Sequence, residues 1–279
     1  MAIYSLKYKN LLTPPLKNHF SQQFSGNIWK IWLDAQAPLL LIEIRNGTTY
    51  HTHFSLLSLE NFCFIWQDYQ LEETWWVGVS ALHNRHIFFY TYQDEQQPFP
   101  QDLWVVQADS QQLLWKSEQY LFQGFYQDQL ITYQNQGESL DYYATSLSTG
   151  KILKKIQPKK ENWLQDCNIH LETKYPMHYK TGQQYFETVQ KFLFKRFQIQ
   201  AIHCIDYLEY GGFILMAYFC ELENAATAHH LLVLNQKGSI VWQDCLQKEA
   251  KGLNLDSFFV FEHKLFYIKN KTELLIYQL

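Results

Sequence analysis

Histidine pairs are the residues of this sequence whose types and spacing come nearest to a metal or catalytic site. His51 and His53 are two residues apart, so a strand would place both imidazoles on one face, where they could bind zinc together. No third ligand follows at a predictable spacing, although Glu43 could come from a neighbouring strand. We therefore expect no bound metal and interpret the pair as surface or turn residues of a threonine-rich strand.

Two other histidine pairs are less well placed for chemistry. His229 and His230 are adjacent, so a strand would point their side chains to opposite faces. His83 and His86 are separated by two residues that we expect to form a turn. Neither pair predicts a metal site.

The Trp75–Trp76 pair is the local feature with the clearest link to ligand binding. In a strand the two indoles would point to opposite faces, and both would be buried if neighbouring sheets cover both faces. The alternative is an exposed indole at the mouth of a ligand site. The candidate residues for a ligand-binding face are His51, His53, Trp76, His83, Arg85 and His86.

Carboxylate pairs and linear motifs give weaker indications of catalysis. Glu72–Glu73 and Glu221 with Glu223 fall in predicted loops, where solvated carboxylates are usual. A glycosidase needs two carboxylates about 5–10 Å apart, which loops of different repeats could supply beside tryptophans suited to sugar stacking. The sequence contains no Gly-x-Ser-x-Gly, P-loop, dinucleotide-binding or His-Glu-x-x-His motif. Catalytic residues are therefore unassigned, and no cofactor is expected.

A degenerate internal repeat predicts the elements that must position these residues. Each copy begins with a strand in which apolar and polar residues alternate. A turn of Asp, Asn, Ser, Gly or Gln follows, and then a second, apolar strand that ends at Trp or Lys. The copies cover residues 56–66, 105–115, 144–154 and 232–242. Each predicts a β-hairpin, with Gly150 and Gly238 where the turn needs a positive φ.

The spacing of these hairpins predicts the fold class. The copies end at positions 66, 115, 154 and 242, so they are 49, 39 and 88 residues apart, and 88 is twice 44. Hairpins that recur every 40–50 residues or so are typical of propellers built from four-stranded blades. A length of 279 residues then predicts an all-β propeller of about six blades, with a range of five to seven. The aromatic content of 17% agrees with β structure.

One segment departs from the β pattern. Thr181 to Gln184 resembles a capping box, and apolar residues then recur at helical spacing up to Phe197. We therefore expect one inserted amphipathic helix near 183–197 that covers an end or side of the propeller. The alternative is a helix that docks a partner.

The two ends of the chain are expected to meet. Residues 257–279 supply about three strands, one fewer than a four-stranded blade needs. An N-terminal strand, either Ile3–Lys9 or Ile28–Leu33, could pair with them and remove an exposed edge. The whole chain, 1–279, is thus expected to form a single domain.

Charge and cysteine content exclude several classes of protein. The net charge is −4 and only three residues are arginine, so the chain is not expected to bind nucleic acid. No apolar run approaches the roughly 18 residues that span a membrane, and the N-terminus lacks the features of a signal peptide. Five cysteines at wide spacing suit reduced thiols. We expect a cytoplasmic monomer.

The sequence also resembles known families. The hairpins at 144–154 and 232–242 resemble the repeat of quinoprotein-type propellers, but the cofactor-binding acidic, Arg and Asn residues of those enzymes have no matching set here. Over most of its length the chain is similar to an uncharacterised bacterial family of domain-of-unknown-function type. The similar stretches include WWVGVSALHNRHIFFYTYQ, HYKTGQQYFETVQKFL, DYLEYGGFILMAYF and KLFYIKNKTELLIYQL. This resemblance implies a quinoprotein-like or WD-like propeller fold and no assigned activity.

Two functional classes follow from these observations. The first is a non-catalytic binding or scaffold protein that uses one face of the propeller to hold a protein partner or a small ligand. The alternative is a carbohydrate-active hydrolase or lyase with its catalytic residues on loops. We expect the first, because the sequence lacks catalytic motifs.

Overall fold

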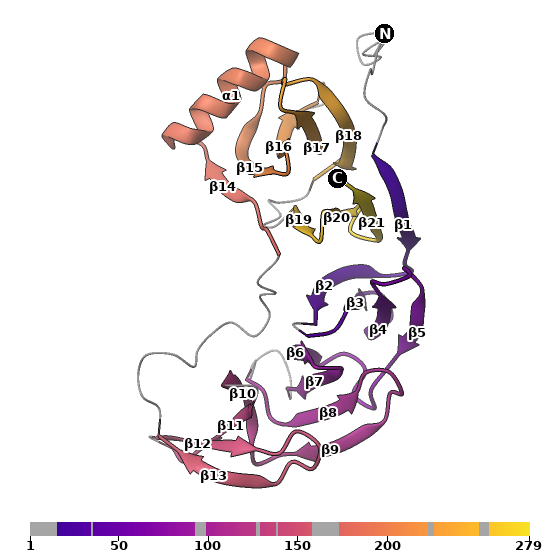
Figure 1. The fold of residues 1–279 in the computed structure, drawn as a ribbon, viewed down its shortest axis with the longest axis vertical. Coiled ribbons are helices and arrows are strands. Elements are labelled where there is room, and N and C mark those ends of the chain that lie inside the picture. Colours follow the sequence, from indigo (N-terminus) through magenta and orange to yellow (C-terminus); the bar gives the residue numbers. More distant parts are fainter. Residues whose placement is uncertain are drawn as a thin grey trace. The chain divides into compact units, whose positions relative to one another are not determined.

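Antiparallel sheets make up almost all of the described structure. The computed structural model describes residues 16–34, 36–92, 99–126, 129–137, 139–157, 173–222, 226–250 and 257–279. Within these ranges the chain forms five antiparallel sheets of four or five strands and one helix (Figure 1). The prediction of an all-β fold with one helix is confirmed. The chain divides into two compact units, Ser25–Leu171 and Met1–Phe24 with Glu172–Leu279, and the prediction of a single domain stays a prediction.

The Ser25–Leu171 unit contains three sheets, each built from four strands consecutive in the chain. Sheet 1 comprises β2 (Asn27–Leu33), β3 (Leu39–Asn46), β4 (His51–Ser58) and β5 (Phe64–Tyr69). Sheet 2 comprises β6 (Val77–His83), β7 (His86–Thr91), β8 (Leu103–Gln107) and β9 (Leu113–Ser117). Sheet 3 comprises β10 (Leu121–Tyr126), β11 (Gln129–Asn135), β12 (Leu140–Thr145) and β13 (Ile152–Ile156).

The other unit contains two sheets and the helix. Sheet 4 comprises β14 (Met177–Lys180), β15 (Ile202–Tyr210), β16 (Phe213–Glu221), β17 (Thr227–Asn235) and β18 (Ile240–Gln247). Sheet 5 has the order β1 (Lys17–Gln23), β21 (Glu273–Gln278), β20 (Lys264–Lys269) and β19 (Phe258–Phe261). Helix α1 (Gln184–Phe197) lies between β14 and β15 in the sequence.

Sheet 5 joins the two ends of the described chain. Strand β1 pairs antiparallel with β21, from Lys17 opposite Gln278 to Gln23 opposite Glu273. The prediction that an N-terminal strand completes the C-terminal sheet is confirmed, but the segment is different. Ile28–Leu33 lies in β2 and pairs with β3, and Ile3–Lys9 lies outside the described residues.

All four predicted hairpins are present, as β4–β5, β8–β9, β12–β13 and β17–β18. The seventh residue of every copy has a positive φ: Phe62 at 57°, Gln111 at 60°, Gly150 at 69° and Gly238 at 70°. The turns therefore need the left-handed conformation even where the residue is not glycine. That conformation costs a residue with a Cβ about 1–2 kcal/mol.

Aromatic rings fill the spaces between adjacent sheets of the Ser25–Leu171 unit. Phe89 on sheet 2 packs against Phe54 on sheet 1, with ring centroids 4.8 Å apart. Its neighbour Phe88 points to the other face and contacts Phe122 and Phe125 on sheet 3 at 5.2 and 5.3 Å. Both faces of sheet 2 are thus covered, which explains why its strands are apolar on both sides.

Helix α1 begins later than its capping pattern predicts. Its N-cap is Gln183, with no side-chain capping hydrogen bond. Thr181, the predicted N-cap, instead donates its hydroxyl to the carbonyl of His203 at 2.9 Å. Phe186 and Leu193 are buried. The predicted apolar stripe is narrower than expected, because the side chains of Tyr185 and Phe192, which it includes, are exposed.

Candidate functional site

The predicted ligand-binding residues do not converge. Trp76 immediately precedes β6, whereas His83 is the last residue of that strand. A strand of this length separates its ends by about 20 Å, so Trp76 cannot share a binding site with His83, Arg85 and His86. The prediction that Trp75 and Trp76 lie in a strand is also wrong, since β6 begins at Val77.

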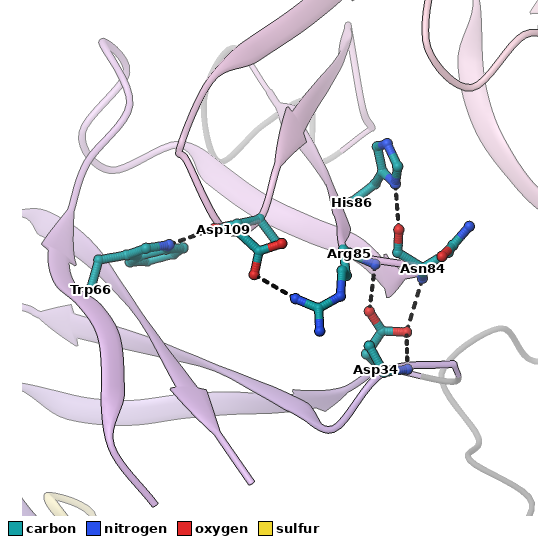
Figure 2. Close-up of polar contacts among 8 residues, drawn as sticks. Asp34, Trp66, Asn84, Arg85, His86 and Asp109 are labelled. Carbon is teal, nitrogen blue, oxygen red and sulfur yellow. Dashed lines mark hydrogen bonds and ion pairs between the residues drawn. The ribbon is translucent and has the colours of Figure 1, made fainter. Parts of the chain in front are cut away.

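Arg85 and His86 have structural partners at the β6–β7 turn (Figure 2). Asn84 and Arg85 both have positive φ, and their backbone N–H groups donate to the carboxylate of Asp34 at 2.9 and 2.7 Å. The Arg85 guanidinium forms an exposed ion pair with Asp109 at 2.8 Å. His86 Nδ1 donates to the carbonyl of Asn84 at 2.6 Å. These contacts fix the turn.

Of the three remaining histidine candidates, His51 and His53 are neighbours, and His83 lies apart from them. His83 is buried and stacks on Phe125, with ring centroids 3.9 Å apart. The rings of His51 and His53 are 6.2 Å apart, as expected for residues on one face of a strand. Among the described residues, no group of three or more His, Cys, Asp or Glu side chains could hold a metal ion.

An open groove forms instead at the end of sheets 1 and 2 that carries Trp76. Its volume is about 700 Å³, and its lining residues are Arg45, Tyr50, Glu73, Thr74, Trp75 and Trp76. Arg45 lies near the end of β3, Tyr50 immediately precedes β4, and residues 73–76 precede β6. The backbone N–H of Thr52 donates to the carbonyl of Thr74 at 2.6 Å, so the segment before β6 is held against the start of β4.

Arg45 organises the floor of this groove. Its Nε donates to Glu43 at 2.6 Å, and its Nη1 and Nη2 donate to the carbonyls of Trp75 and Val77 at 3.3 and 2.6 Å. The guanidinium also lies 5.3 Å from the ring centroid of Trp29 and 5.5 Å from that of Trp75. Burial raises the pKa of the Glu43 carboxyl, with Arg45 opposing the shift. Arg45 therefore ties β3 to the start of β6.

Glu73 fixes the two indoles. One carboxylate oxygen, Oε1, accepts from the backbone N–H groups of Trp75 and Trp76 at 2.7 and 2.8 Å. Tyr50 meets the edge of Trp75, with ring centroids 5.2 Å apart and planes at 77°. Trp76 packs against Tyr92, with ring centroids 5.4 Å apart. All four residues from Glu73 to Trp76 are half-buried. The groove thus presents ordered, partly exposed aromatic rings beside a carboxylate.

A second polar cluster lies in the other unit. Asp206 on β15 accepts from Nδ1 of His178 at 2.6 Å and from the hydroxyl of Ser257 at 2.5 Å. Ser257 Oγ also lies 3.1 Å from Nε2 of His229, which stacks on Phe219 at 4.1 Å. Because the serine donates its proton to Asp206, it accepts from His229, so His229 is not placed to act as the base for a serine nucleophile. The cluster is a buried structural network.

This network makes the stability of its unit depend on pH. Burial lowers the pKa of His229 from 6.5 to about 4, with Asp206 opposing the shift and His230 adding to it. As the pH falls below 6.5, the unfolded chain binds a proton that the folded chain does not. The free energy of unfolding should then fall by about 1.4 kcal/mol per pH unit until the folded imidazole titrates.

Urea denaturation followed by far-ultraviolet circular dichroism, at pH 7 and at pH 5, measures this effect. His229→Gln is the matched variant, since its side-chain amide keeps an N–H donor for Ser257 and does not titrate. The variant should lose less stability than the wild type between the two pH values. Equal losses would show that His229 does not contribute.

Sequence reasoning missed most of the residues in both sites. Of the groove residues, only Trp76 is a predicted candidate, because the others come from three segments with no shared spacing. One indication was available: Glu43 and Arg45 are two apart in a strand, so they share a face and can form an ion pair. His229 is not a predicted site residue, because adjacent strand positions point the side chains of His229 and His230 to opposite faces. Its partners, Asp206 and Ser257, are distant in the sequence.

None of the curated proteins matches the chain. A solved structure described as a crystal structure of the eukaryotic initiation factor aligns with 93% of this chain at 11% identity and a TM-score of 0.32. The chain spans 55% of the length of that structure. Within the described residues, no helix has the length and apolar character needed to cross a membrane.

A family model matches part of the sequence. The match covers residues 33–115, which include every residue that lines the groove and the Asp34 network at the opposite end of the same sheets. Residues 33–115 of this chain match DUF4905, a domain of unknown function.

Proposed function

We propose that this protein is a non-catalytic binding protein whose ligand site is the groove formed by Arg45, Tyr50 and residues 73–76. The observation that carries the proposal is the ordering of two half-buried indoles by Glu73 and Arg45. A volume of about 700 Å³ lies within the range of small-molecule sites, about 300–1,000 Å³. Rings that are already fixed lose little conformational entropy when a ligand binds.

The carboxylates near the groove favour binding over hydrolysis. A glycoside hydrolase needs one carboxyl group as a proton donor and a second as a nucleophile or base. Glu43 is 1% exposed and forms an ion pair with Arg45. Glu73 uses one oxygen to hold the backbone of Trp75 and Trp76. Both carboxylates therefore have structural roles, and we do not propose the hydrolase or lyase.

We further propose that the sheets are blades of a β-propeller. Two equivalent hydrogen bonds support this arrangement. The indole N–H of Trp66, the last residue of the first hairpin copy, donates to the carbonyl of Ala108 on the next sheet at 2.6 Å. Trp115, the last residue of the second copy, donates in the same way to Leu147 at 2.7 Å. Ala108 and Leu147 occupy the same repeat position, the fourth, so the same contact joins successive sheets in these two copies.

A reducing compartment, and hence the cytoplasm, is the proposed location. The four cysteines of the described chain, Cys63, Cys204, Cys220 and Cys245, carry free thiols. Burial raises the pKa of Cys204 to about 11, which keeps that thiol protonated and unreactive. Free thiols are typical of proteins in a reducing compartment.

The Trp76→Ala variant tests the binding proposal. Wild type and variant would be screened by thermal shift against sugars, nucleotides, amines and short peptides, and each ligand would be recovered and analysed for turnover. At least one class should raise the melting temperature of the wild type, leave the variant unchanged, and be recovered intact. If a ligand raises the melting temperature of both proteins equally, its binding site lies outside this groove. If a ligand is recovered in a chemically converted form, the protein is an enzyme.

A further inference from the structure

The groove's charges and free polar atoms define the chemistry of its ligand. We propose that the groove binds a neutral carbohydrate, whose apolar C–H face stacks on the Trp76 indole and whose hydroxyls bond to Glu73 and Thr74. This inference rests on the proposed binding function and adds the class of ligand. It depends on three observations: the state of Arg45, the surroundings of the aromatic rings, and the unused hydrogen-bonding atoms.

An anionic ligand does not fit the groove, because Arg45 is largely buried and already hydrogen-bonded. The Arg45 side chain is 11% exposed, and its three guanidinium nitrogens donate to Glu43, Trp75 and Val77. Glu43 offsets its charge at 2.6 Å, and Glu73 adds a further negative charge at the wall. Bidentate recognition of phosphate or carboxylate needs a guanidinium edge that is free. Three of the five N–H groups of Arg45 are already used and its side chain is largely buried, so it is poorly placed for such recognition.

A cationic ligand does not fit the ring faces that Arg45 already covers. Cation–π binding requires an open ring face within about 6 Å of the cation. The guanidinium of Arg45 already lies 5.5 Å from the centroid of Trp75 and 5.3 Å from that of Trp29. An ammonium group brought to the same rings would meet the charge of Arg45. Arg45 therefore disfavours a cation at these two rings, and its own pairing with Glu43 leaves no unpaired positive charge to attract an anion.

The unused polar atoms fit hydroxyl groups. Within the described chain, Glu73 Oε2, the Thr74 hydroxyl and the indole N–H groups of Trp75 and Trp76 take part in no hydrogen bond. Together they offer acceptors and donors at the edge of an aromatic surface. A sugar presents the matching combination, because its ring has an apolar C–H face and a rim of hydroxyls that both donate and accept.

Three oligosaccharides of equal length test this inference by isothermal titration calorimetry. Chitopentaose is neutral, its deacetylated form is cationic, and pentagalacturonate is anionic; cellopentaose and xylopentaose extend the neutral set. The variants are Trp76→Ala, which removes a stacking ring, and Glu73→Gln, which removes the charge. Tyr126→Ala is the control, since Tyr126 is an exposed aromatic residue on β10 that does not line the groove.

A neutral oligosaccharide should bind more tightly than both charged ones. Trp76→Ala should weaken its binding about tenfold or more, and Tyr126→Ala should leave it unchanged. Preferential binding of a charged probe that is still lost in Trp76→Ala would overturn the carbohydrate inference and leave the proposed binding function intact. Absence of binding by every neutral probe, or neutral binding that Trp76→Ala does not weaken, would also overturn it. The thermal-shift screen decides the binding function separately.

Discussion

Asp34→Ala is expected to lower the free energy of unfolding of the Ser25–Leu171 unit by more than about 3 kcal/mol. The carboxylate is 1% exposed. Its Oδ1 accepts from the N–H groups of Gln36, Ala37 and Asn84 at 2.8, 3.2 and 2.9 Å, and its Oδ2 accepts from Arg85 at 2.7 Å. Alanine would leave these donors without their acceptor and would release sheet 1 from the β6–β7 turn (Figure 2).

Two matched variants separate these contacts from a general effect of charge. Asp34→Asn keeps the oxygen that serves three of the donors but turns an amide towards Arg85, so it should cost less than the alanine change. Asp109→Ala removes the exposed ion pair with Arg85. The side chain of Asp109 is 37% exposed and that of Arg85 is 46% exposed, so this variant should lower the free energy of unfolding by less than about 1 kcal/mol.

Urea unfolding followed by tryptophan fluorescence measures all three variants. Eight of the nine tryptophans lie between residues 25 and 171, so the signal reports mainly on this unit. Equal costs for Asp34→Ala and Asp109→Ala would contradict the assigned role of the buried carboxylate.

The sheets could be predicted because their determinants are local. Each hairpin is specified within eleven residues by alternating apolar positions and a turn at a fixed place. Residues at the seventh position adopt a positive φ in every copy, including Phe62 and Gln111. The turn is therefore fixed by the length of the loop and by the strands it joins, and glycine only lowers its cost.

The candidate site could not be predicted because its determinants are not local. Trp75 and Trp76 look like the start of an apolar strand. However, their backbone N–H groups donate to the carboxylate of Glu73, so they form no hydrogen bonds to a neighbouring strand. The pairing of Thr52 with Thr74 brings this segment to the end of sheet 1. Nothing in the spacing of these residues along the chain records that contact.

The same distinction between local and distant determinants applies to Arg85 and His86, which the sequence predicts on a ligand-binding face. Charged and aromatic residues at a turn suggest function when their partners are unknown. Here the backbone of Arg85 is held by Asp34, which lies 51 residues earlier, and its side chain by Asp109. A turn with two consecutive positive φ values leaves N–H groups that need an acceptor, and the sequence does not show where that acceptor comes from.

Gly150→Ala is expected to destabilise sheet 3 through its contact with Trp115. Gly150 has a φ of 69°, and a Cβ there would lie 2.7 Å from Cδ2 and 2.8 Å from Cε3 of Trp115. The ring cannot move away freely, because its indole N–H donates to Leu147 in the same turn. Strain at positive φ and overpacking should together cost about 3 kcal/mol.

Gly137→Ala separates these two contributions on the same sheet. Gly137 has a φ of 83° and no atom within 4 Å of an added Cβ, so alanine there should cost only about 1 kcal/mol from the backbone. In a Trp115→Leu background, Gly150→Ala should lower the free energy of unfolding by about as much as Gly137→Ala does, because the smaller leucine side chain leaves room for the added Cβ. Tryptophan fluorescence during urea unfolding measures each cost. If Gly150→Ala costs the same in both backgrounds, the Trp115 ring does not constrain this turn.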